Sequence, residues 1–123
     1  MKYDQHFILA LFHVLFVSPL FLFVGFQRAS TSTWLYNALL AIGAVILIYH
    51  GYKLIVRLSK GSSYVWVNAI HILFIAPLLL YIGYHKRETP RAAYEMLLML
   101  GFAAIGYHLF SLVRQMEIHS ESE

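Results

Sequence analysis

The chain has 123 residues, of which 60% are hydrophobic and only 12% charged, with a mean hydropathy of +0.67, a formal net charge of +3 and no cysteine. A soluble domain of this length could not bury so much apolar surface, so a soluble globular fold is excluded. The lack of cysteine excludes disulfides, thiolate metal ligands and cysteine nucleophiles. No basic stripe stands outside the apolar segments, so no binding of nucleic acid is expected.

Four apolar stretches follow one another, each close to the ~20 residues that cross a hydrocarbon layer of ~30 Å. They cover residues 7–26, 34–56, 64–84 and 94–113. Lys2 in front of the first stretch also fits a cleavable signal peptide, but that stretch is too long for one. The sequence therefore predicts an all-α fold, a four-helix transmembrane bundle that forms one membrane domain over residues 1–123.

The second half of the chain repeats the first. A shift of 58 residues aligns residues 11–57 with 69–115 without a gap and with fifteen identities. We predict two duplicated helical hairpins, repeat 1 at about 7–57 and repeat 2 at about 64–115. Because each hairpin has an even number of spans, the repeats are parallel and related by a pseudo-twofold axis along the membrane normal.

The termini and the central loop then share one membrane face. That face carries five basic residues, Lys2, Lys53, Arg57, Lys60 and Arg114, and the opposite face carries four, Arg28, Lys86, Arg87 and Arg91. The difference leans toward cytoplasmic termini. The expected partners are the lipid bilayer and either further copies of the chain or a larger membrane complex.

Matched residues of the second span fall on one face of a helix. At about 100° per residue they form one stripe, Tyr36, Leu39, Leu40, Gly43, His50 and Leu54, and Tyr94 and Gly101 repeat it in the fourth span. We expect this stripe to pack against other helices, with the glycines allowing close approach. The first span has a narrower stripe of His13, Phe16 and Leu20, repeated as His71, Phe74 and Leu78. Pro19 and Pro77 are expected to take part in helix packing as well. Each removes a backbone hydrogen bond and is expected to kink its helix.

Four matched histidines lie inside the predicted spans: His13, His50, His71 and His108. His13 lies six residues after the start of its span and His50 six residues before the end of the next, antiparallel one. Both are thus ~9 Å below the same face, at ~1.5 Å per residue, and the other two come within a turn of that level. Burying four imidazoles without partners would cost several kcal/mol, so this layer requires partners.

Three interpretations of the histidine layer stay open. The histidines could bind haem b or a transition metal, with His50 and His108, or His13 and His71, as the ligands, and Gly43 and Gly101 leaving room for a ring edge. They could relay protons or ions beside Tyr49 and Tyr107. They could also act as structural polar contacts that bond to a tyrosine, Ser18, Asn68 or a backbone carbonyl. No hydrolase, phosphate-binding or dinucleotide signature occurs, so no enzymatic activity is expected.

Three segments carry a resemblance to a family: IHILFIAPLLLYIGY over residues 70–84, ETPRAAYEMLL over residues 88–98, and GYH over residues 106–108. In these segments the chain resembles small uncharacterised four-span membrane proteins of large DNA viruses of algae and protists. The resemblance implies an internal-membrane or virion protein without implying a mechanism. The first repeat departs from the pattern, with Ser32 where Pro90 stands and Trp34 where Ala92 stands.

The parallel repeat makes a topological prediction. Ser30→Cys should react with an impermeant thiol reagent from one side of the membrane, and Ser62→Cys from the other, because one span separates the two loops. The chain has no native cysteine to interfere. Labelling of both variants from the same side would contradict the parallel repeat.

Overall fold

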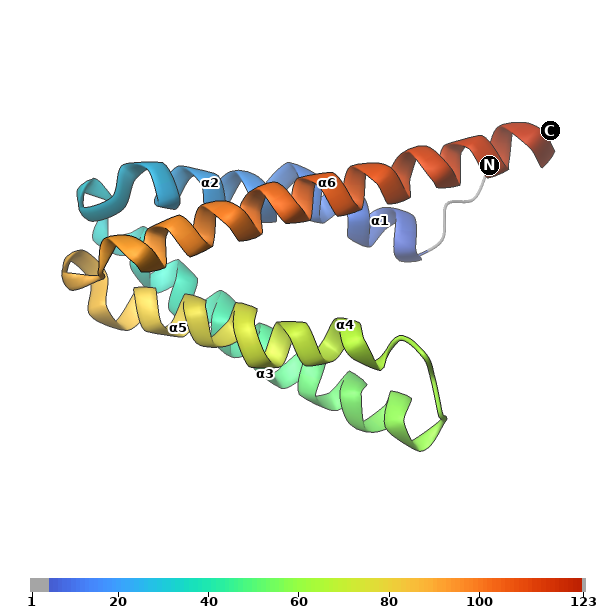
Figure 1. The fold of residues 1–123 in the computed structure, drawn as a ribbon, viewed down its shortest axis with the longest axis horizontal. Coiled ribbons are helices and arrows are strands. Elements are labelled where there is room, and N and C mark those ends of the chain that lie inside the picture. Colours follow the sequence, from blue (N-terminus) through green and yellow to red (C-terminus); the bar gives the residue numbers. More distant parts are fainter. Residues whose placement is uncertain (1–4, 123) are drawn as a thin grey trace. The chain divides into compact units, whose positions relative to one another are not determined.

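The structure is a computed structural model that describes residues 5–122 (Figure 1). Its described part is helical and contains no strand. Four stretches are long and apolar enough to cross a membrane: Gln5–Ser30, Thr33–Ser59, Val65–Glu88 and Arg91–Ser122. The predicted all-α fold with four membrane-length helices is confirmed.

The first and third spans are built from the same series of elements. The first contains α1 (Gln5–Phe12), the π-helix η1 (His13–Val17), α2 (Ser18–Gln27) and the 3₁₀-helix η2 (Arg28–Ser30). The third contains α4 (Val65–Ile70), the π-helix η3 (His71–Ile75), α5 (Ala76–His85) and the 3₁₀-helix η4 (Lys86–Glu88). The second and fourth spans are the single helices α3 (Thr33–Ser59) and α6 (Arg91–Ser122).

Each π-helix ends two residues before the proline of its span. The backbone N–H of Ser18 bonds to the carbonyl of His13, and that of Ala76 to the carbonyl of His71, five residues back instead of four. Because proline has no N–H and its ring crowds the carbonyl four residues earlier, an ordinary α-helical turn is disrupted there. The π-turns in front of Pro19 and Pro77 therefore interrupt the regular α-helix at the positions where kinks were expected.

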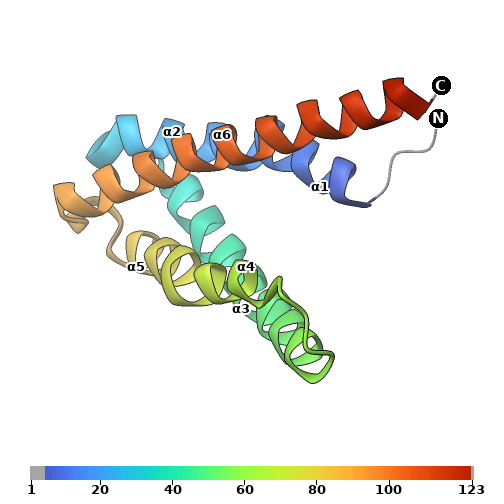
Figure 2. The ribbon, with the colours of Figure 1, turned by 45° about the vertical axis from the view of Figure 1, so that its right-hand side comes forward.

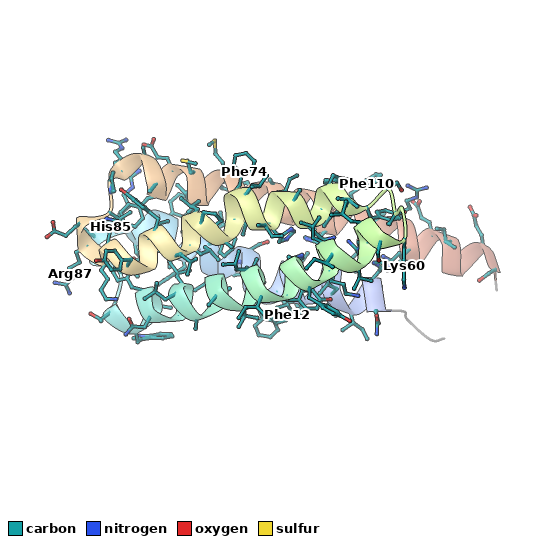
Figure 3. All side chains as sticks on the ribbon, turned by 90° about the horizontal axis from the view of Figure 1, so that it is seen from below. Phe12, Lys60, Phe74, His85, Arg87 and Phe110 are labelled. Carbon is teal, nitrogen blue, oxygen red and sulfur yellow. The ribbon has the colours of Figure 1, made fainter. Side chains whose placement is uncertain are left out.

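The π-turns also overturn one expectation about packing. Phe16 and Phe74, in the middle of the stripes predicted for the first and third spans, are 63% and 61% exposed, and Phe74 points away from α3 in Figure 3. The prediction assumed about 100° per residue throughout. A π-turn holds an extra residue, so the face that a stripe follows changes within it.

The helices form two compact units. Unit 1 contains the described residues up to Phe26 together with those from Glu95 onward, and unit 2 is Gln27–Tyr94. In unit 2, α3 packs against α4, η3 and α5 and runs antiparallel to them (Figures 1 and 2). In unit 1, α6 runs antiparallel to α1 and α2 (Figure 1). Each unit thus takes one span from each repeat, so the compact units differ from the repeats.

Equivalent residues make the helix contacts of both units. A Cβ atom built on Gly43 would lie 3.1 Å from the side chain of Leu80, and one on Gly101 would lie 2.9 Å from Leu22. Leu22 and Leu80 are themselves 58 residues apart, as are the two glycines. The same glycine-to-leucine contact therefore holds the first span to the fourth and the third to the second.

Gly83 approaches the neighbouring helix in unit 2 more closely than Gly43 does. A Cβ atom there would lie 2.8 Å from the backbone oxygen of Tyr36 and 2.9 Å from the backbone nitrogen of Leu40. Such a contact cannot be relieved by rotating a side chain, so only glycine fits while α5 keeps this distance from α3.

Gly83→Ala is expected to lower the free energy of unfolding by ~1–3 kcal/mol, because the added methyl group overlaps the backbone of α3. Gly51→Ala in α3 is the matched control, since its Cβ would meet nothing within 4 Å. Alanine is favoured over glycine within a helix by ~0.5–1 kcal/mol, so the control should be neutral or stabilising. Both are measured by unfolding in detergent, and equal stability of the two variants would contradict the contact.

Candidate functional site

The four histidines of the sequence form one close pair in each unit. In unit 1, His13 stacks on His108, with ring centroids 4.4 Å apart and planes inclined by 28°. In unit 2, His50 stacks on His71 at 3.9 Å and 15°. All four side chains are half-buried. These pairs differ from the predicted ligand pairs, which would each take one histidine from each unit.

Two of the rings are held by their own helices in the same way. Nδ1 of His13 lies 2.7 Å from the carbonyl oxygen of Leu9, and Nδ1 of His71 lies 2.6 Å from that of Val67. A carbonyl only accepts, so Nδ1 carries the proton and the lone pair of the neutral ring is on Nε2. Both histidines are the first residues of their π-helices. The proline-associated π-turn and the histidine therefore form one local unit, present twice.

The pair in unit 2 has an additional polar partner. Nδ1 of His50 lies 3.0 Å from Oδ1 of Asn68, whose side chain is only 1% exposed. The equivalent residue of the first repeat is Ala10, which is 2% exposed. The two histidine pairs are therefore alike in their stacking and different in their surroundings.

The stacked rings do not fit a shared metal ion. An imidazole nitrogen binds a metal through a lone pair in the ring plane, at ~2.0–2.1 Å, so an ion shared by two histidines must lie in both planes. Two planes inclined by 15°, with centroids 3.9 Å apart, do not meet near the rings. The same pair cannot supply both axial ligands of one haem either, because the two axial ligands lie on opposite sides of the iron. Among the described side chains, which are those of residues 5–122 without His119, no three histidine or acidic groups gather where they could hold an ion.

A second polar cluster surrounds the predicted packing residues Tyr36 and Tyr94. Their hydroxyl oxygens lie 2.7 Å apart, and the side chains are 1% and 2% exposed. Tyr36 also donates to the carbonyl of Arg28 at 2.8 Å, and Tyr94 to that of Lys86 at 3.0 Å. The two tyrosines are equivalent in the repeat, so this is an isologous contact, of the kind made where a twofold axis relates two copies.

The turns that bring these carbonyls to the tyrosines are also equivalent. Arg28 and Lys86, the first residues of η2 and η4, both have a φ of 51°. Residues other than glycine rarely adopt a positive φ, and it persists where surrounding contacts impose it. The carbonyl of Arg28 closes its turn by accepting the backbone N–H of Thr31, and that of Lys86 accepts that of Thr89.

Sequence reasoning missed Gly83 and the two carbonyls among the residues that matter here. Gly83 carried a signal, because Gly25 is its equivalent in the repeat. The positive φ of Arg28 and Lys86 carried none, since neither residue type favours it. Pro19 and Pro77 were expected to take part in helix packing, but their side chains are exposed.

No family model, curated protein or solved structure matches the chain. The two repeats remain as internal comparisons for each other. What they share, the stacked histidines, the π-turns and the tyrosine contact, is the arrangement on which a function can be argued.

The hydroxyls of Tyr36 and Tyr94 have two protons for the contact between them and the two carbonyls, and the Lys86 carbonyl also accepts from the hydroxyl of Thr89 at 2.6 Å. The two tyrosines therefore complete only two hydrogen bonds at any instant. Tyr36→Phe and Tyr94→Phe should therefore each cost about one hydrogen bond, ~0.5–1.5 kcal/mol, and the double variant about their sum. A double-mutant cycle on detergent-solubilised protein measures this. Tyr52→Phe, which introduces the residue found at the equivalent Phe110, is the control and should be neutral. A coupling energy above ~0.5 kcal/mol would contradict this count of hydrogen bonds.

Proposed function

We propose that the chain is a structural integral membrane subunit in which the paired histidines hold the helices of each unit together. One observation carries the proposal: each unit has a stacked histidine pair, and the rings of His13, His50 and His71 are fixed by hydrogen bonds within the fold. Polar contacts between helices contribute ~0.6–2 kcal/mol in membrane proteins. The fold itself thus provides a use for these side chains.

The resemblance to viral four-span proteins extends this proposal to a location. It implies a subunit of an internal membrane or of a virion, with the lipid bilayer and either further copies or a larger complex as its partners. The chain supplies four apolar helices and only short connections between them. A role within the bilayer suits such a chain better than one in solution.

A second candidate is binding of haem or a transition metal by one histidine from each unit, His13 with His71 or His50 with His108. The observation in its favour is the Nδ1–H bond to a backbone carbonyl at His13 and His71. Histidines that bind metals commonly donate Nδ1–H in this way, which fixes the ring and leaves Nε2 for the metal.

A visible spectrum and elemental analysis separate the two candidates. Protein purified from cells supplied with haem and metals should be colourless and metal-free if the histidines are structural. His50→Gln should then be tolerated, because its amide can still bond to Asn68. His50→Leu should cost ~1–3 kcal/mol, because it leaves the Asn68 oxygen without its donor.

His6→Leu is the control, since His6 is exposed near the start of α1. It should match the parent in stability and spectrum. A Soret band or stoichiometric metal that is lost when either His50 or His108 is replaced by alanine would instead establish the cofactor site and reject the purely structural function.

A further inference from the structure

The amide of Asn68 is a buried polar group with one atom unsatisfied. Its Oδ1 bonds to Nδ1 of His50, but no atom of the described residues accepts a hydrogen bond from Nδ2. The side chain is 1% exposed and lies in α4, within an apolar span. Buried amides are almost always hydrogen-bonded, because leaving one unpaired costs the full desolvation of that group.

Reversing the amide does not resolve the deficit. If its nitrogen faced His50, then Oδ1 would take the present position of Nδ2, where the structure shows no hydrogen bond. The site therefore calls for a small ligand that can accept from a nitrogen or donate to an oxygen. Water does both, whereas an anion such as chloride only accepts.

The repeat makes the unsatisfied amide specific to unit 2, although Ser18 Oγ in unit 1 and Thr31 Oγ1 in unit 2 are also buried without a hydrogen-bond partner. The equivalent residue in unit 1, Ala10, is itself buried and has no side-chain polar atom. Both repeats keep the histidines, and only the second places an amide against one of them. The stacked pair His50–His71 thus has a polar neighbour that the pair His13–His108 lacks at that position.

We propose that unit 2 binds a water molecule against the Asn68 amide, beside the stacked pair His50–His71. This water accepts a hydrogen bond from Nδ2 of Asn68, and Oδ1 of the same amide accepts one from Nδ1 of His50. Unit 2 then holds a hydrated polar site inside an apolar span, at the level of the histidines. This inference is independent of the structural function proposed above.

The chain offers a sharp spectroscopic test because it contains two asparagines, Asn37 and Asn68. Protein labelled with ¹⁵N only in asparagine, in deuterated detergent, should give two side-chain amide signals. Asn37→Ala identifies the remaining one as Asn68. Asn37 is the internal control: it is exposed, and its Oδ1 accepts from Nζ of Lys86 at 2.9 Å.

Transfer of magnetisation from water to each amide decides the proposal. The Asn68 amide should show a dipolar cross-peak with long-lived water, and the Asn37 amide only exchange with bulk solvent. The Asn68 signal should be unchanged when chloride is replaced by sulfate. A visible Asn68 signal without a water cross-peak would overturn the proposal, and so would a chemical shift that follows the chloride concentration, which would identify an anion instead.

Discussion

The hydroxyl groups of Tyr36 and Tyr94 are in contact, and these two residues are equivalent in the repeat. The duplicated architecture depends on contacts between residues that the repeat relates to each other. Each tyrosine reaches back to the carbonyl at the start of a 3₁₀ turn, at Arg28 or Lys86. The turns η2 and η4 in turn contact each other. Each carbonyl also accepts a backbone N–H of its own turn, so the tyrosines add a further hydrogen bond to groups that lie at the ends of apolar spans.

Helix packing in each unit follows from the same duplication. A glycine of α3 meets a leucine of α5, and the equivalent glycine of α6 meets the equivalent leucine of α2. Lipid offers helices no hydrophobic gain from associating, so close approach at small residues has to supply much of the attraction. Duplication copied both the glycine and the leucine of this contact. The first span therefore pairs with the fourth in the same way as the third pairs with the second.

The prolines connect this packing to the histidines. In the hydrocarbon layer every backbone group needs a partner, and a proline leaves one carbonyl without its usual donor. The π-turn that precedes each proline begins at a histidine, whose ring bonds to the preceding helical turn. Local backbone chemistry therefore fixes His13 and His71, and packing of the neighbouring span brings His108 and His50 onto their faces. Asn68 marks where the two copies have diverged, with an amide in one unit and a methyl group in the other.

The sequence by itself determined the class of protein, the four helices and the duplication, because span length, apolar composition and a constant 58-residue shift need no tertiary information. It also singled out Tyr36, Tyr94 and the four histidines, since matched residues reveal what both copies kept. Tertiary structure alone decided which spans share a unit, that the histidines stack, and that Gly83 touches a backbone. Those outcomes depend on how helix faces meet after the π-turns have shifted the helical register, and a calculation at a constant angle per residue cannot follow that shift.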